Sequence, residues 1–316
     1  MELAPFQVLY QDHHLLIVNK PAGLVIHPTY KHPDGTLWDA LLDYLSQQGD
    51  DGWQPPVLAD KPEWVNAPEH VQSILREQQR ARYTKEQGLL PRPCLLHRLD
   101  KDTSGVVALA RTEVARRHVI RQFEEHTIVK RYLAVAQKGA PDWARPPTAF
   151  TVRRRNASGE EIMEQLPFAL ATLGDDELLL QGPLQRDSDD RRRCIVGLEG
   201  QQATTLVRLL ATEGDFFLLE VRPMTGRTHQ IRAHLAATGY GLVGDQVYAL
   251  PARVGTPQGA LGRQFLHAWS LEFGRYPDND RVTFVAPLAN DLIAWMERYF
   301  PSSLGAIHAT TTLLIR

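Results

Sequence analysis

The sequence predicts an α+β protein built around a largely antiparallel sheet, for three reasons. Short apolar segments with strand-like composition follow one another closely, and polar or glycine-containing turns join several of them. Segments with helical spacing occur at irregular places instead of after every strand, which is not the pattern of a parallel βαβ fold. The 316 residues are 43% hydrophobic and 23% charged, which allows a sizeable core.

The first 45 residues contain the first predicted elements. Residues 8–10 and 15–19 are apolar and flank a polar turn, so we expect two strands there, and residues 24–26 are a candidate third strand. Apolar residues within 36–45 have helical spacing and predict a helix.

Residues 47–92 interrupt this regular pattern. They contain a glycine-rich start, several prolines, charges of both signs and one helical stretch around 71–82. A segment of this length and composition between regular elements is typical of a surface insertion.

The middle of the chain returns to regular structure and then becomes polar. Residues 106–110 are a predicted strand, a helix over 112–125 is expected with Thr112 as its N-cap, and 132–135 is the next strand. Residues 153–200 carry dense charge runs, so we expect polar hairpins and an exposed loop.

Regular elements fill most of the remaining sequence. We expect strands at 203–210, 216–221, 265–273 and 282–285, and helices at 228–237 and 292–300. Residues 301–316 are expected to form a C-terminal tail.

The overall charge and the cysteine content narrow the classes of protein. A net charge of −2 lacks the global basic signature of many nucleic-acid binders. The 28 arginines outnumber the 7 lysines, which reflects either composition bias or use of the planar guanidinium for phosphates and bases. Two cysteines, no signal peptide and no membrane-length apolar run favour a cytoplasmic protein that does not bind a membrane.

Two polar clusters are candidates for chemistry. In the first, residues 96–105, the 102–105 portion is explained by an ordinary turn, whereas Arg98 and Asp100 could hold a phosphate and a reacting centre. In the second, residues 222–232, three arginines surround a tight turn at a helix start, and no acidic residue follows until Asp245. This turn is either an anion site or an arginine-bearing helix cap.

Other motifs fail on their context. Residues 239–244 match GxGxxG, but a helix precedes them where a dinucleotide site needs a strand. His229 and His234 are five residues apart and lack the spacing of a helical zinc motif, so no metal is expected.

Taken together, the clusters resemble the RluA family of RNA pseudouridine synthases. The matching segments occur in family order and lie at 17–24 with His27 and Pro28, at 97–105, at 130–132, at 225–232, at 243–245 with Tyr248, and at 266–268. The resemblance implies a pseudouridine synthase catalytic domain over residues 1–300, with a mixed, largely antiparallel sheet, flanking helices and a central RNA-binding cleft. Family members often carry an N-terminal S4-type RNA-binding domain, and we expect none in this chain.

The resemblance further implies isomerisation of uridine to pseudouridine in RNA, without a cofactor or metal. Asp100 takes the place of the family's essential aspartate, Tyr132 that of the tyrosine packing on the uracil, and Arg227 that of the arginine paired with the aspartate. A carboxylate could attack the sugar or the base, or remove a sugar proton, and the sequence does not choose among these routes.

The RNA contacts implied by the resemblance centre on Arg98, which would enter the stack that the flipped nucleotide leaves. Further candidates for RNA contact lie in or beside the same motifs: His97, Lys20, Lys130, Arg131, Thr228, His229 and Arg232. The expected protein is a monomer acting on a ribosomal or transfer RNA stem-loop.

Two alternatives from other classes remain open. A non-catalytic RNA-binding protein could retain the same fold. A glycosidase acting on sugars or nucleosides needs two carboxylates, and Asp102 is the only obvious partner for Asp100.

Overall fold

The computed structural model describes residues 4–30, 32–48, 52–146, 149–251 and 256–303. The sheet and helices lie within these ranges, whereas most of the expected C-terminal tail lies outside them. The described part of the chain has no helix that is long and apolar enough to cross a bilayer.

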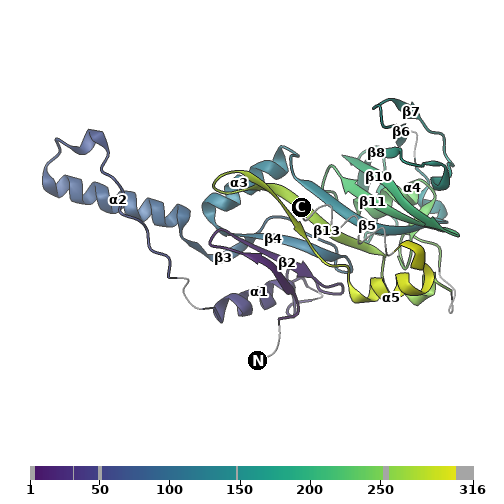
Figure 1. Cartoon of the computed structure of the whole chain (residues 1–316), viewed down its shortest axis with the longest axis horizontal. Coiled ribbons are helices and arrows are strands. Elements are labelled where there is room, and N and C mark those ends of the chain that lie inside the picture. The colour runs from purple at the N-terminus through teal and green to yellow at the C-terminus, as the bar shows by residue number, and fades with distance from the viewer. Residues whose placement is uncertain (1–3, 31, 49–51, 147–148, 252–255, 304–316) are drawn as a thin grey trace.

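One large sheet dominates the fold (Figure 1). Within the described ranges it has 14 strands, and its main path runs in the order β1-β2-β4-β13-β5-β11-β10-β8-β6-β7. The strands are β1 (Gln7–Gln11), β2 (Leu15–Lys20), β3 (Leu89–Leu95), β4 (Ser104–Thr112), β5 (Val129–Lys138), β6 (Thr151–Arg155), β7 (Glu161–Met163), β8 (Glu177–Arg186), β9 (Cys194–Val196), β10 (Gln201–Glu213), β11 (Phe216–Pro223), β12 (Tyr240–Leu242), β13 (Leu266–Arg275) and β14 (Asp280–Val285). β13 is parallel to β4 and antiparallel to its other neighbours, so the predicted α+β class with a largely antiparallel sheet is confirmed.

Among the described residues, four of the five α-helices pack on the sheet. The helices are α1 (Leu37–Ser46), α2 (Glu69–Gln87), α3 (Glu113–Glu124), α4 (Gln230–Ala237) and α5 (Asn290–Tyr299). Leu15 and Ile17 of β2 pack in one core with α3, while Leu16 and Val18 pack in another with α1. Because side chains alternate along a strand, this apolar run serves both faces. In the other half of the sheet, α4 and α5 pack against the strands in two separate hydrophobic cores.

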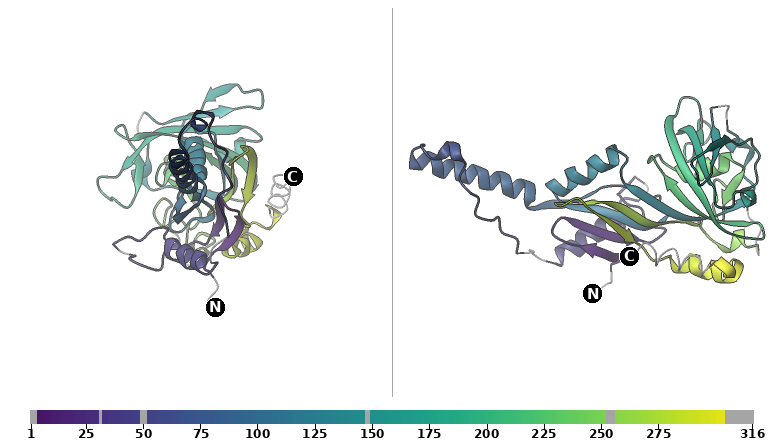
Figure 2. Two further views of the ribbon diagram at one scale, coloured as in Figure 1. Left: turned by 90° about the vertical axis from the view of Figure 1, so that its left-hand side faces the viewer. Right: turned by 45° about the horizontal axis from the view of Figure 1, so that its top comes forward.

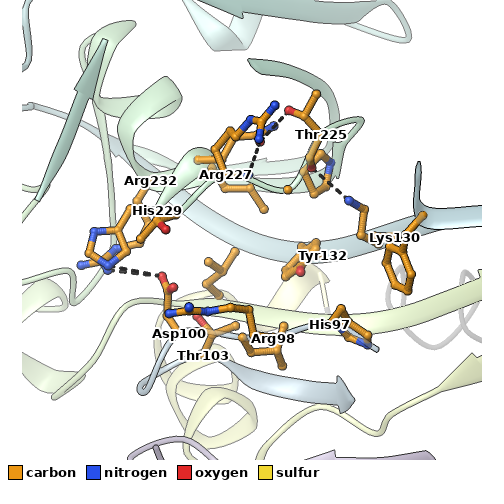
Figure 3. Close-up of a pocket in the computed structure, with 18 of the residues that line it drawn as sticks. His97, Arg98, Asp100, Thr103, Lys130, Tyr132, Thr225, Arg227, His229 and Arg232 are labelled. Carbon is orange, nitrogen blue, oxygen red and sulfur yellow. Dashed lines mark hydrogen bonds and ion pairs between the residues drawn. The ribbon is translucent and has the colours of Figure 1, made fainter. Parts of the chain in front are cut away.

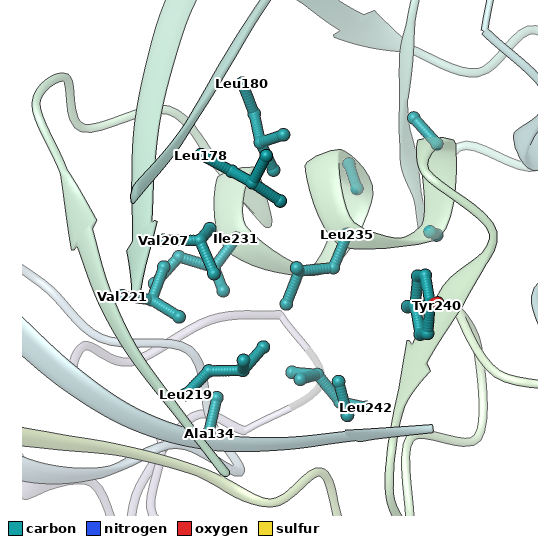
Figure 4. Packing of buried hydrophobic residues seen from close by; sticks show 14 of the residues in the cluster. Ala134, Leu178, Leu180, Val207, Leu219, Val221, Ile231, Leu235, Tyr240 and Leu242 are labelled. Atoms are coloured by element: carbon teal, nitrogen blue, oxygen red, sulfur yellow. The ribbon is translucent and has the colours of Figure 1, made fainter. Parts of the chain in front are cut away.

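The core below α4 fixes the position of the second polar cluster. Ile231 and Leu235 of α4 point toward Leu180, Val207 and neighbouring apolar residues of the sheet (Figure 4). All eight residues of α4 are buried, so the loop that leads into this helix has one defined position over the sheet.

The structure differs from the sequence prediction at residues 24–26, which do not form a strand. The carbonyl of Leu24 accepts from Lys20 Nζ, and those of Val25 and Ile26 accept from the first backbone N–H groups of α1. These groups cap a helix and bind a lysine, so they have no need of a partner strand.

One strand lies partly in the expected surface insertion, and one strand of the region expected to form polar hairpins is apolar and buried. β3 falls partly inside the expected insertion and contains Pro91 and Pro93, which cannot donate to a ladder, and its pairing with β4 is irregular. β8 lies within the polar 153–200 region, but Leu178 and Leu180 are buried in the main core.

Helix α2 stands away from the rest of the molecule (Figures 1 and 2). It is 19 residues long and extends beyond the predicted stretch of 71–82 at both ends, and none of its residues is buried. At its base the indole of Trp53 stacks on His13 and Tyr83, with ring centroids 5.1 and 6.2 Å apart.

Candidate active site

A cavity of about 280 Å³ lies where the loop before β4 meets the loop between β11 and α4 (Figure 3). Asp100 and Arg98 come from the first loop, Lys130 and Tyr132 from β5, and Arg227 from the second loop. The two polar clusters of the sequence therefore line one cavity, together with the β5 motif.

A glycine fixes the approach of the first loop to the sheet. Gly105, in β4, has a φ of +123°, and a Cβ at this position would lie 2.1 Å from the carbonyl oxygen of Ala268 on β13. Any other residue would separate β4 from β13 and displace the Asp100 loop that enters β4.

Asp100 faces an arginine that is itself held by a second carboxylate. Its Oδ2 lies 3.5 Å from Nη1 of Arg232. The Nε and Nη2 atoms of Arg232 donate to the two oxygens of Asp245 at 2.7 and 2.9 Å. Burial disfavours the charge on Arg232, but the Asp245 carboxylate outweighs it and raises the arginine pKa, so Asp100 faces a permanent cation.

The expected pairing of Arg227 with Asp100 is not the one that the structure shows. Arg227 is exposed, and its Nε donates to the backbone carbonyl of Gln202 at 3.3 Å. It precedes α4, whereas Arg232 lies inside the helix, where its side chain reaches Asp100. Arg232, expected only to contact RNA, takes the position beside the carboxylate.

Tyr132, on strand β5, lines the same cavity as Asp100 and Arg232. Burial raises its pKa, and the charge of Asp100 raises it further, so the hydroxyl stays protonated at neutral pH. Tyr132 thus offers a flat apolar ring and a neutral hydroxyl to whatever occupies the cavity.

Gln230 and Asp245 were not among the expected site residues. The Gln230 side chain accepts from Thr225 Oγ1 at 2.7 Å and from the Arg227 backbone at 3.0 Å, and it donates to Thr204 O at 2.9 Å. It thereby fixes the turn before α4. Both residues lie in segments that match the family, 225–232 and 243–245, and this match is the sequence feature that could have identified them.

Six of the eight expected RNA-contact residues line the cavity, namely Arg98, His97, Lys130, Thr228, His229 and Arg232. Arg98 is exposed. Lys130 Nζ donates to Thr225 O at 2.9 Å, and burial lowers its pKa to about 8, so it is mostly a cation at neutral pH. His97 Nε2 accepts from the Ala108 backbone at 3.1 Å.

His97 is neutral, which changes what it can offer to RNA. Burial, with a further contribution from the charge of Lys130, lowers its pKa to about 3. It can supply a ring surface or a hydrogen bond but no positive charge.

Two of the expected RNA-contact residues are occupied elsewhere. Lys20 is completely buried, and its Nζ donates to the carbonyls of Pro21, Leu24 and Lys101 at 2.7–2.9 Å. It joins two loops instead of facing the cavity. Arg131, which alternates with its cavity-lining neighbours on β5, pairs with Glu272 at 3.1 Å.

No group of three or more histidine, cysteine or acidic side chains able to hold a metal occurs among the residues that the structure covers. The cavity chemistry described above rests on one carboxylate, arginines, a lysine and a tyrosine.

The fold is that of a pseudouridylate synthase domain. The human RNA pseudouridylate synthase domain containing 4 superposes with a TM-score of 0.52 at 20% identity, covering 93% of this chain and 92% of that one. The human domain containing 1 superposes with a TM-score of 0.51, also at 20% identity, and covers 93% and 90%.

The chain belongs to the RNA pseudouridylate synthase family, and the resemblance to its RluA type is confirmed. The family model matches residues 14–237. An uncharacterized RNA pseudouridine synthase of Chloroflexus aurantiacus is 35% identical over 274 residues, which are 87% of this chain and 63% of that protein. The ribosomal large subunit pseudouridine synthase D of Xanthomonas campestris is 31% identical over 298 residues, covering 91% and 67%.

The chain thus spans slightly less than two thirds of the Chloroflexus protein's length. The comparisons establish the fold and the family of this chain.

Proposed function

We propose that this protein isomerises uridine to pseudouridine in RNA, with Asp100 as the catalytic carboxylate. The observation that supports this most directly is the meeting of Asp100, Tyr132 and Arg232 at one cavity, in a chain of this family. The reaction breaks the N1–C1′ bond, joins C1′ to C5, releases the C5 proton and places a proton on N1, so the mass is unchanged.

The charges around Asp100 suit this role. Arg232 presents a positive charge to the carboxylate and restricts its orientation, and the neutral Tyr132 supplies a surface on which a uracil ring can pack. Asp100 could then act on the sugar or on the base, and its side chain is accessible from the cavity.

The target base must leave its stack to reach the cavity, at a cost of a few kcal/mol. Arg98 is exposed at the cavity and is not engaged in an ion pair within the described part of the chain. Its guanidinium plane is free to stack in the vacated position and to hold a phosphate.

The proposed substrate is a structured ribosomal RNA, with transfer RNA as the other candidate. Several relatives are named ribosomal large subunit pseudouridine synthase D, among them those of Nitrosomonas europaea and Xanthomonas campestris, which favours the large-subunit RNA. Action as a cytoplasmic monomer belongs to the same proposal.

The test is incubation of the purified protein with large-subunit ribosomal RNA tritiated at C5 of uridine. Release of tritium, with new carbodiimide-reactive positions and unchanged RNA mass, supports the isomerase. Free uracil in the supernatant would instead support the glycosidase, in which Asp102 would act with Asp100. Tight RNA binding without tritium release, on RNA from a strain that lacks the protein, would support the non-catalytic alternative.

A further inference from the structure

His229 is the N-cap residue of α4 and has a backbone conformation that histidine seldom adopts. Its φ of +54° and ψ of +19° lie in the left-handed region, where glycine or asparagine would be less strained. Such strain persists where the surrounding structure fixes the residue, and it occurs often at functional sites. In this conformation the imidazole ring faces two polar groups, the carboxylate of Asp100 and the hydroxyl of Tyr248.

The two ring nitrogens of His229 face different partners. Nε2 lies 3.9 Å from Oδ2 of Asp100, and Nδ1 lies 3.0 Å from the hydroxyl of Tyr248. The first distance is too long for a hydrogen bond in the free protein, but catalytic hydrogen bonds commonly shorten when substrate binds.

The Tyr248 hydroxyl is itself fixed in place. The residue is fully buried, and its oxygen accepts from the Cys194 backbone N–H at 2.6 Å. Its single hydrogen has two acceptors within reach, the Cys194 carbonyl at 2.9 Å and His229 Nδ1 at 3.0 Å. When it goes to His229, the ring proton of the neutral imidazole is on Nε2 and points at Asp100.

The same turn also holds the second group that faces Asp100. Asp245 accepts from the backbone N–H of Tyr248 at 3.0 Å while its carboxylate binds Arg232, whose guanidinium lies 4.7 Å from the Tyr248 ring centre. Residues 245–248 therefore anchor both the arginine and the histidine that approach the carboxylate.

We propose that His229 is a positioning residue for Asp100, and that Tyr248 sets the ring tautomer by donating to Nδ1. The neutral ring then presents Nε2–H to Asp100, so that the histidine and Arg232 approach Oδ2 together. This proposal rests on the proposed function for its catalytic consequence, whereas the tautomer itself belongs to the free protein.

Tyr248→Phe removes only the hydroxyl, and the chain offers a matched control. Tyr240 is also buried, and its hydroxyl accepts from Leu170 N at 3.0 Å and donates to Phe168 O at 3.1 Å, without contact to the site. We expect Tyr248→Phe to lower kcat roughly tenfold with KM within about twofold, and Tyr240→Phe to leave both within about twofold. Equal losses in the two variants would overturn the proposal, because loss of a backbone anchor would then explain both.

A double-mutant cycle tests whether the two residues act together. His229→Gln should lower kcat about as much as Tyr248→Phe does. The kcat of the double variant should be about the same as that of either single variant. Effects that multiply would overturn the proposal. If Tyr248→Phe does not fold, His229→Gln and the spectrum of the wild-type protein still test it.

The tautomer can be measured without RNA by ¹⁵N NMR of the histidine rings, with His229 assigned as the signal missing from His229→Gln. We expect the Nε2–H form in the wild-type protein and a shift away from it in Tyr248→Phe but not in Tyr240→Phe. An Nδ1–H signal in the wild-type protein would overturn the proposal. If the wild-type protein formed no pseudouridine, the proposed function would fail, while this spectrum would still decide the tautomer.

Discussion

Nη1 of Arg232 lies 3.5 Å from Oδ2 of Asp100, and the same guanidinium is held by both oxygens of the buried Asp245. The bidentate pair keeps the arginine charged and immobile although it is only 7% exposed. Asp100 therefore meets a cation that is held in one place by a second carboxylate.

Arg232→Gln should mainly lower the stability of the protein, whereas Arg227→Gln should mainly weaken RNA binding. Loss of Arg232 leaves the Asp245 carboxylate buried without its cation, so we expect a loss of about 3–5 kcal/mol in the free energy of unfolding. Loss of the exposed Arg227 should change that free energy by less than about 0.5 kcal/mol and mainly weaken RNA binding. Urea titration and RNA binding by filter retention measure the two effects.

Arg232→Lys completes this comparison, because it keeps the charge and loses the bidentate geometry. It should retain more stability than Arg232→Gln but still lower kcat, since the cation facing Asp100 is no longer fixed. If instead Arg227→Gln removed activity and Arg232→Gln did not, the assignment of the partner arginine would be wrong.

Lys20→Met should destabilise the protein without removing an RNA contact. The carbonyls of Pro21 and Leu24 lose their lysine donor, which we expect to cost about 2–4 kcal/mol. Burial lowers the Lys20 pKa from 10.5 to about 7, so the unfolded chain binds the extra proton between these values. The stability of the wild-type protein should therefore gain from this group as pH rises from about 7 to 10.5, and Lys20→Met should lack that gain.

The measurement is urea unfolding of both proteins across that pH range. A constant difference between them at every pH would mean that Lys20 has the same pKa in the folded and unfolded chains. RNA affinity, measured under conditions where both are folded, should agree within about twofold.

Lys130→Met should weaken RNA binding at pH 7 more than at pH 9. Burial lowers the pKa of this lysine to about 8, so its charge is present at pH 7 and mostly lost at pH 9. We expect roughly a tenfold loss of affinity at pH 7 and a smaller one at pH 9. Lys138→Met, at the exposed end of the same strand, is the control and should have no pH-dependent effect.

Arg98→Ala should lower RNA affinity and turnover while leaving stability within about 0.5 kcal/mol of the wild type, because the side chain is exposed. RNA affinity should fall steeply with salt despite the net charge of −2, because the local field at the cavity decides phosphate binding. In Arg98→Ala the slope against log salt should be shallower by about 1. An unchanged slope would place this arginine away from the phosphates.

The sequence predicted the meeting of the catalytic motifs better than the direction of individual side chains. Asp100 and Tyr132 line one cavity as expected, because the resemblance covers both motifs and the strands that bring them together. Nothing in the sequence of residues 222–232 shows where the side chain of each of its three arginines points. Only the folded turn shows that Arg227 points to Gln202 and Arg232 to Asp100.

Burial explains the other differences. Lysine is usually a surface residue, yet three carbonyls from two loops stabilise Lys20 inside the fold. The apolar residues 24–26 have strand composition, but their carbonyls serve Lys20 and α1. Such tertiary partners are not visible in local spacing.

The most direct test of the central proposal is Asp100→Asn in the tritium-release assay on large-subunit ribosomal RNA. The substitution preserves the size of the side chain and removes its charge and basicity. We expect no release above background, with RNA affinity within a few fold of the wild type. Release at the wild-type rate by a folded Asp100→Asn protein would contradict the role of Asp100.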